Sequence, residues 1–238
     1  MKSWLKETCQ ILRVAGFPAL IALILSAVID QQINQQLEAL LMNEDGPGTQ
    51  LWLLAGASLF NGLLFPIFAT ACVLYGLART RGDAEAPLDF LERVLNQIYI
   101  EVLRSWGSAL TWGLLLILPG FIRMIQLMFV PLIVVFHRAY DEGEADALRT
   151  SGTYTRRHPF RLLGYLVLFY LVIPLTLTSL LDSWRAYDST PVAAIGCTAL
   201  DLVVLILSLQ TLYRLFERTR KELGDESVFP VERDPSAA

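Results

Sequence analysis

Residues Leu51–Ala78 read LWLLAGASLFNGLLFPIFATACVLYGLA, 28 residues without a Lys, Arg, Asp or Glu. A helix needs about 20 apolar residues to cross the roughly 30 Å of hydrocarbon in a bilayer. This stretch is therefore long enough to span a membrane with some tilt. Its length and lack of charge favour a membrane protein over a soluble helical bundle with buried core helices.

The rest of the chain repeats this pattern. Of its 238 residues, 54% are hydrophobic and only 18% are charged, whereas soluble domains have about 25% charged residues. We predict an all-α, polytopic transmembrane helical bundle of about six spans. Its other apolar stretches are Ile11–Ile29, Trp106–Leu118, Phe121–Phe136, Leu162–Leu181 and Val192–Tyr213.

Basic residues are distributed unevenly between these stretches. If the chain crosses the membrane at each stretch, seventeen of its nineteen Lys and Arg residues fall on one side. Cytoplasmic loops retain Lys and Arg, so that side is predicted to be cytoplasmic, with both termini there. Arg123 and Arg185 are the two exceptions. The basic start and apolar run of the N-terminus also resemble a signal peptide, but Arg13 sits late and no small-x-small cleavage site follows, which favours an uncleaved first span.

Two amphipathic segments are predicted at the cytoplasmic interface. After Pro87, apolar residues recur at helical spacing and polar residues take the other side. That helix fits either a membrane-surface or partner-binding role or a connecting helix packed under the bundle. The second segment is a short helix over Glu144–Arg156. The apolar positions of the first helix are Leu88, Leu91, Leu95, Ile98 and Val102.

Prolines and glycines predict where the spans bend or reverse. Pro66 and Pro174 interrupt apolar stretches, where a missing N–H bends a helix. Leu118-Pro119-Gly120-Phe121 is the turn signal between the third and fourth spans, so that hairpin is expected to be tight. The fourth span is short and contains Pro131, so either the bilayer thins there or the pair is partly re-entrant.

One ordered string carries a resemblance to a known family: Pro119-Gly120, Arg123, Pro131, Glu142-Gly143 and Ala147-Leu148-Arg149-Thr150-Ser151. It resembles the bacterial six-span proteins related to the membrane domain of glycerophosphodiester phosphodiesterases. The resemblance implies an integral domain of the bacterial cytoplasmic (inner) membrane. The catalytic part of those enzymes is a separate soluble barrel of about 250 residues. These 238 residues contain no such segment, so the resemblance does not carry the hydrolase activity over.

Polar residues within spans are the best candidates for a site. Asp201 sits within the last span, where inserting a carboxylate costs about 2.5–3.5 kcal/mol. We expect it to pair with Asn61, Gln126 or Arg123 and to mark an internal cavity. The alternative is that Asp201 is protonated or hydrogen-bonded locally while Arg123 extends to lipid headgroups.

Other chemistry is not predicted. His137 and His158 are the only histidines and lack further ligands at helical spacing, so we expect no metal site and no cofactor. The net charge is −4 and the basic residues form no patch with aromatics, which excludes nucleic-acid binding. Arg156, Arg157 and Arg161 form a juxtamembrane cluster that fits either anionic-lipid contact or ordinary topology determination.

These observations predict a single transmembrane domain over residues 1–216 and a mobile cytoplasmic tail over 217–238. The leading function is non-catalytic: a membrane protein that organises lipid or partner proteins in envelope maintenance. The alternative is a small transporter or lipid-handling protein with an intramembrane polar site around Asp201 and Arg123. Membrane lipids and other membrane proteins are the expected partners.

Overall fold

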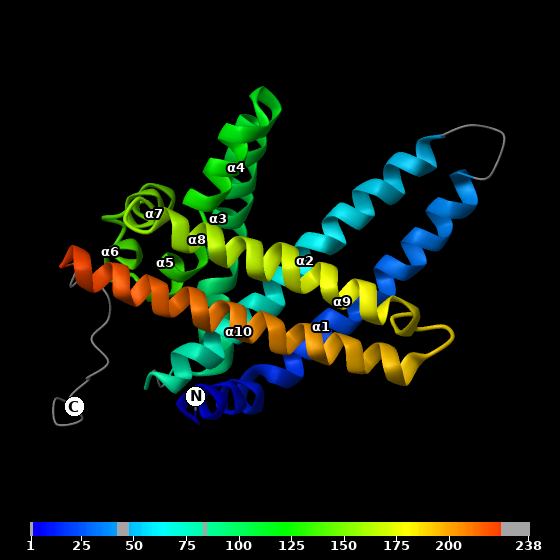
Figure 1. Ribbon diagram of the computed structural model, residues 1–238, viewed down its shortest axis with the longest axis horizontal. Coiled ribbons are helices and arrows are strands. Elements are labelled where there is room, and N and C mark those ends of the chain that lie inside the picture. The colour runs from blue at the N-terminus through cyan, green and yellow to red at the C-terminus, as the bar shows by residue number, and fades with distance from the viewer. Residues whose placement is uncertain (1, 42–47, 83–84, 225–238) are drawn as a thin grey trace. The chain divides into compact units, whose positions relative to one another are not determined.

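The long apolar stretches form helices, as expected. The computed structural model describes residues 2–41, 48–82 and 85–224, with side chains from Trp4 onward, and none of these residues forms a β-strand. The fold is all-α (Figure 1). Its elements are α1 (Lys2–Leu41), α2 (Thr49–Thr80), α3 (Pro87–Leu115), α4 (Ile117–Gln126), α5 (Val130–Phe136), α6 (Arg138–Asp141), α7 (Ala147–Thr155), α8 (Pro159–Leu166), the π-helix η1 (Val167–Val172), α9 (Ile173–Leu181), the 3₁₀-helix η2 (Asp182–Trp184) and α10 (Pro191–Leu223).

Five helical stretches of the described chain are long and apolar enough to cross a membrane. About six were expected. The remaining one, Trp106–Leu118, is not an independent helix, because Leu116 divides it between the end of α3 and the start of α4. The five stretches are Trp4–Leu41, Thr49–Thr80, Ile117–Phe136, Pro159–Trp184 and Pro191–Leu223.

The chain forms two compact units. The first contains Met1–Val73 and Leu177–Ile206, and the second contains Leu74–Thr176 and Leu207–Ala238. Whether residues 1–216 act as one domain stays a prediction. The predicted tail begins too early, because α10 continues to Leu223. Residues 225–238 lie outside the part of the chain that the structure describes.

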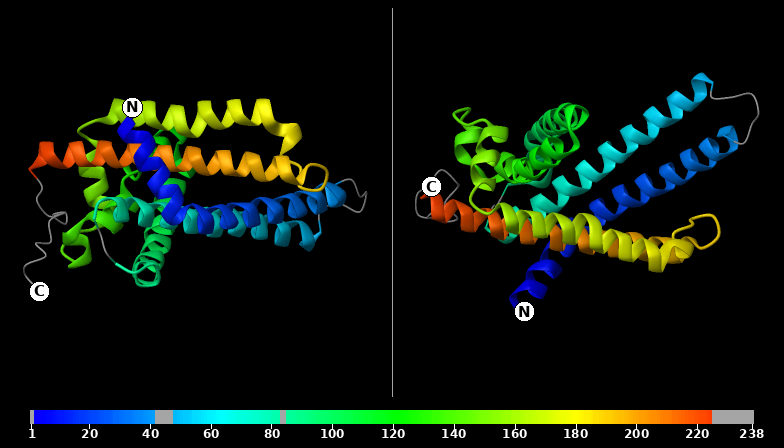
Figure 2. Two further views of the ribbon diagram at one scale, coloured as in Figure 1. Left: turned by 90° about the horizontal axis from the view of Figure 1, so that it is seen from below. Right: turned by 45° about the horizontal axis from the view of Figure 1, so that its top comes forward.

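The first unit joins α1 and the N-terminal part of α2 through a buried polar contact. The two helices run in opposite directions in both views of Figure 2. Asn61 of α2 is 3% exposed. Its amide donates to the backbone oxygen of Ser26 on α1 at 2.9 Å and contacts the Ser26 hydroxyl at 3.4 Å. Interhelical hydrogen bonds of this kind are a common link between membrane helices.

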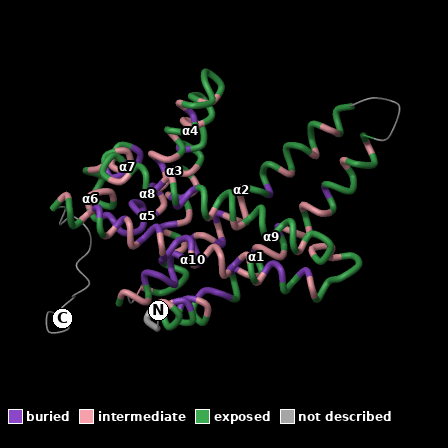
Figure 3. The backbone as a smooth tube through the Cα atoms, in the orientation of Figure 1, coloured by how far each residue is buried: buried purple, intermediate pink, exposed green. Residues whose placement is uncertain are grey.

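The second unit has its core around α5, drawn as buried in Figure 3. Every residue of α5 except Pro131 is buried. Phe129, Tyr154 and Phe216 stack nearby, with ring centroids 5.9 Å apart for Phe129–Phe216 and 5.4 Å apart for Tyr154–Phe216. Since α5 is enclosed by protein, it contributes to the core of this unit.

The helix after Pro87 forms, and its most buried stripe is shifted from the centre of the predicted apolar face. Pro87 begins α3, where a missing N–H is tolerated. Of the five predicted apolar positions only Ile98 is buried, and Leu88 is largely exposed. Leu91, Leu95 and Val102 are partly buried, so the fully buried stripe is rotated around the helix from the predicted face without leaving it. The buried residues of α3 are Phe90, Val94, Ile98, Glu101 and Ser105.

A candidate polar pocket in the first unit

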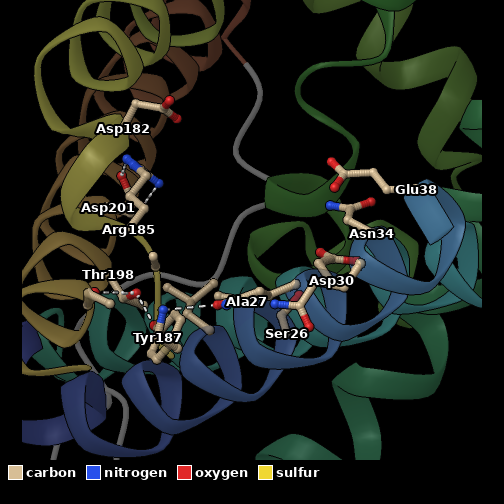
Figure 4. Close-up of a pocket in the computed structure, with 15 residues that line it drawn as sticks. Ser26, Ala27, Asp30, Asn34, Glu38, Asp182, Arg185, Tyr187, Thr198 and Asp201 are labelled. Atoms are coloured by element: carbon tan, nitrogen blue, oxygen red, sulfur yellow. Dashed lines mark hydrogen bonds and ion pairs between the residues drawn. The ribbon is translucent and has the colours of Figure 1, made fainter. Parts of the chain in front are cut away.

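A polar stripe follows the apolar part of α1. Helix α1 does not stop at Asp30 but continues to Leu41, and its polar residues recur three and four positions apart, which places them on one face. Figure 4 shows Asp30, Asn34 and Glu38 of this face bordering the pocket. The four-residue spacing is visible in the sequence, but the sequence analysis did not single out these residues as part of a site.

The opposite wall carries an ion pair. Asp201 of α10 accepts two hydrogen bonds from Arg185, from Nη1 to Oδ2 and from Nη2 to Oδ1, both at 2.9 Å. This is the bidentate geometry in which guanidinium and carboxylate interact most strongly. About a third of each side chain is exposed, so the pair remains in contact with the pocket (Figure 4).

This arrangement corrects the predicted pairing. Asn61, Gln126 and Arg123 were expected to be partners of Asp201, but both of its carboxylate oxygens accept from Arg185. Arg185 reaches Asp201 because the short helix η2 turns the chain back after α9. Such a reversal depends on how a loop folds, which helical periodicity does not encode.

The segment between η2 and α10 is fastened to both walls. The amide nitrogens of Gln31 and Gln35 donate to Asp188, each at 2.6 Å. The Tyr187 backbone N–H donates to the Gln31 side-chain oxygen at 2.9 Å. The Tyr187 hydroxyl also contacts the hydroxyl of Thr198 on α10 at 2.5 Å. These bonds hold α1, the turn and α10 around one space.

The space is a cavity of about 580 Å³, comparable to small-molecule sites. Four carboxylates line it and only one guanidinium, so its charge is predominantly negative. Two buried atoms at its border, Asp30 Oδ1 and Arg185 Nε, have no hydrogen-bond partner in the described part of the chain. An unsatisfied buried polar atom costs about 1–3 kcal/mol, so water or a ligand would stabilise the site. The charged lining residues are Asp30, Glu38, Asp182, Arg185 and Asp201.

The other two predicted site residues, Arg123 and Gln126, belong to the second unit. Arg123 Nε donates to the Ser108 hydroxyl at 3.1 Å, and its Nη1 donates to the Gln126 side-chain oxygen at 3.1 Å. Arg123 is thus bonded across the α3–α4 hairpin instead of pairing with a carboxylate. It fixes the spacing between the two helices.

The reversal between α3 and α4 occurs earlier than predicted. Leu116 alone is extended, with φ −156° and ψ 131°, while Pro119 and Gly120 lie inside α4. Gly120 instead lies where α4 packs closely against α3. A Cβ atom built on it would lie 2.5 Å from Gly113 Cα and 2.7 Å from Gly113 N. Only a glycine fits so close to another backbone.

The remaining prolines have different effects. Pro66 is incorporated into the continuous helix α2. Pro131 is the second residue of α5 and lies in its first turn, where it does not bend the helix. Pro174 follows the π-helix η1. Because Pro174 has no N–H to donate, the preceding turn lacks one regular hydrogen bond, and a widened turn accommodates that loss.

A second charged cluster lies at the base of the α3–α4 hairpin, and the sequence analysis did not predict it. Arg104 Nη2 donates to Asp146 at 2.8 Å, and its Nη1 lies 3.5 Å from the buried carboxylate of Glu101. Burial would raise the pKa of Asp146. The hydrogen bonds from Arg104 and from the backbone N–H groups of Arg149 and Leu148 outweigh burial and lower it. Burial, and secondarily Glu101, raise the pKa of Tyr140 to about 12.

The juxtamembrane arginines Arg156, Arg157 and Arg161 are all exposed, as contact with lipid headgroups would require. Neighbouring His158 lies 2.8 Å from Glu222. Among residues 2–41, 48–82 and 85–224, no group of three or more His, Cys, Asp or Glu side chains is arranged to hold a metal ion.

Comparison of this chain with protein-family models, with curated proteins and with solved structures finds no match.

Proposed function

We propose that this chain is a multi-pass protein of the bacterial inner membrane, with both termini cytoplasmic, that binds the headgroup of an amine-bearing zwitterionic phospholipid. The site is the pocket between α1 and α10. Binding would organise lipid in the envelope without catalysis. The observation that carries the proposal is a negatively charged polar pocket with a single guanidinium, built on helices apolar enough to lie in a membrane.

The charges of the pocket suit a zwitterion. A headgroup ammonium would be attracted by the carboxylates of Asp30 and Glu38, because opposite charges interact strongly where water is partly excluded. A headgroup phosphate would be attracted by Arg185, since guanidinium groups bind phosphate well. An anionic lipid without an amine would meet four carboxylates and be disfavoured.

The surroundings of the pocket suit acyl chains. The same helices carry exposed apolar side chains, including Leu25 and Ile29 on α1 and Ile195 on α10. A phospholipid bound by its headgroup could therefore keep its chains against apolar protein and neighbouring lipid. Arg156, Arg157 and Arg161 would add nonspecific attraction to anionic lipids, about 1 kcal/mol per basic residue near the surface.

A second candidate is transport of a small soluble amine. One observation favours it: the pocket extends to Asp201, which lies within the apolar helix α10. Intramembrane carboxylates commonly mark ion and substrate pathways. The proposed membership in the family related to the phosphodiesterase membrane domain fits either candidate, because it concerns the membrane scaffold and not the ligand.

Native mass spectrometry of the protein in nanodiscs tests the proposal. Nanodiscs made from equal amounts of phosphatidylethanolamine and phosphatidylglycerol should yield protein enriched in bound phosphatidylethanolamine. Combining Asp30→Asn with Glu38→Gln should abolish the enrichment, whereas the control Glu144→Gln, in an exposed loop, should not change it. Equal binding of both lipids by the wild-type protein would refute the proposal. Displacement of lipid by a soluble amine such as ethanolamine would favour transport.

A further inference from the structure

We infer that the α3–α4 hairpin is a re-entrant element. Residues 105–122 enter the bilayer from the cytoplasmic side, with Leu116 near the midplane, and return to the same side. The partner is the hydrocarbon of one leaflet, with lipid headgroups around the base of the hairpin. This inference does not depend on the ligand of the pocket, because every residue that supports it lies in the second unit.

The hairpin is a close pair of helices with a short tip. Figure 1 shows α3 and α4 side by side, with their connection at the end of the pair. The extended residue Leu116 reverses the chain. Gly120 lets the backbone of α4 approach the backbone of α3 at Gly113, and the Arg123–Ser108 hydrogen bond joins the helices lower down.

The tip of the hairpin is apolar and exposed. Residues 114–118 read LLLIL, and Leu114 and Ile117 are 89% and 87% exposed. No Lys, Arg, Asp or Glu occurs between Arg104 and Arg123. An exposed apolar surface of this kind marks a membrane or protein contact, and here it belongs to a chain with several membrane-spanning helices.

The length of the hairpin matches half of a bilayer. From Leu116, Arg123 is seven residues away and Arg104 is twelve residues away. At 1.5 Å per residue, the charged base therefore lies about 10–18 Å from the tip. Half of the hydrocarbon core measures about 15 Å. Crossing the whole core would bury both arginines or leave the LLLIL tip in water on the far side.

The base of the hairpin is held by polar structure. The Gln126 carbonyl at the end of α4 accepts hydrogen bonds from Ser151 Oγ at 2.6 Å and from Thr155 Oγ1 at 3.3 Å. At the α3 side, Arg104 donates to Asp146, the N-cap of α7. Helix α7 and its N-cap thus bind the base of both hairpin helices, α3 and α4. These polar contacts place the base of the hairpin at the boundary between membrane and water.

The chain after α4 does not continue into the far leaflet. Although Ile117–Phe136 is long and apolar enough to span a membrane, it is broken by a turn at residues 127–129. The α5 segment that follows is enclosed by protein. Four spanning stretches and one re-entrant hairpin keep both termini on the same side. Arg123 then joins the cytoplasmic majority, and Arg185, paired with Asp201, is the single remaining exception.

Cysteine accessibility tests this topology. The native cysteines are first replaced (Cys9→Ser, Cys72→Ala, Cys197→Ala). Leu116→Cys then carries the test, and Leu118→Cys repeats it if the first variant does not fold. Reference positions are Ser189→Cys, before α10, and Glu144→Cys, before α7. A membrane-impermeant maleimide should label position 189 in right-side-out vesicles and position 144 in inside-out vesicles. Position 116 should be labelled in neither and should react fully after detergent.

Depth-dependent quenching distinguishes lipid from protein cover. A bimane fluorophore at position 116 of the purified, reconstituted protein should be quenched more by lipids brominated near the chain ends than near the headgroup. Labelling of position 116 together with position 189 would show that the hairpin crosses the membrane. Labelling of position 116 together with position 144 would show that the hairpin is not inserted in the membrane. Protection without bromine quenching would show that another protein surface covers it. Each of these three outcomes overturns the inference.

Discussion

Replacement of Gly120 by alanine should specifically destabilise the α3–α4 hairpin. The added Cβ would lie 2.5 Å from Gly113 Cα and 3.2 Å from the Ala109 carbonyl oxygen, whereas ordinary contacts are 3.4–4 Å. Relieving these contacts requires the helices to separate by roughly 1 Å, and overpacking of this kind costs about 1–3 kcal/mol. Alanine is favoured over glycine within a helix by about 1 kcal/mol, which offsets part of the loss.

Two glycines of the same helix pair serve as matched controls. A Cβ atom on Gly107 or Gly113 would have no neighbour within 4 Å, so Gly107→Ala and Gly113→Ala gain helix propensity without the clash. We therefore expect Gly120→Ala to be less stable than either control by about 1–3 kcal/mol.

The assay is unfolding of the purified protein in mixed micelles with increasing dodecyl sulfate, followed by circular dichroism. Each variant yields a free energy of unfolding relative to the wild-type protein. If Gly120→Ala matched the two controls within about 0.5 kcal/mol, which is usual for substitutions without a structural consequence, the close crossing of the hairpin helices would be refuted.

Three further predictions concern the polar contacts. Arg185→Gln, Asp201→Asn and the double variant should show a coupling energy of about 1 kcal/mol in the same unfolding assay, because the pair is bidentate but partly exposed; additive effects would contradict the pairing. The pKa of Asp146 in the folded protein lies below its ordinary value of 3.8. The ionised carboxylate therefore stabilises the folded protein above pH 3.8, and this stabilisation is lost as the pH falls through the folded-state pKa. Melting temperatures measured between pH 5 and pH 3 should therefore fall less in Asp146→Asn, which still caps α7 but loses the charge paired with Arg104. Asn61→Leu should lower the free energy of unfolding by about 0.6–1.7 kcal/mol, the range for hydrogen bonds between membrane helices; an unchanged value would argue against its interhelical bond.

The long spanning helices could be predicted from local properties of the sequence. The uncharged run Leu51–Ala78 forms part of α2, because length and apolarity alone decide whether a segment can cross hydrocarbon. Asp201 could likewise be singled out, since a carboxylate in an apolar segment requires a polar environment wherever the chain folds. The polar stripe from Asp30 to Glu38 could also have been predicted, because its residues recur at helical spacing in the sequence.

The contacts that form the candidate site were decided by tertiary structure. Asp201 pairs with Arg185 because η2 reverses the chain, and sequence spacing does not specify the path of a loop. Gly120 marks a helix crossing and not the turn itself, because the need for glycine arises from a backbone seven residues away. Which segments can reside in a membrane follows from local composition, since transfer from water to lipid depends on each segment alone. Which side chains meet, and which apolar tip is left without a protein neighbour, depends on contacts between distant segments and so emerged only from the folded chain.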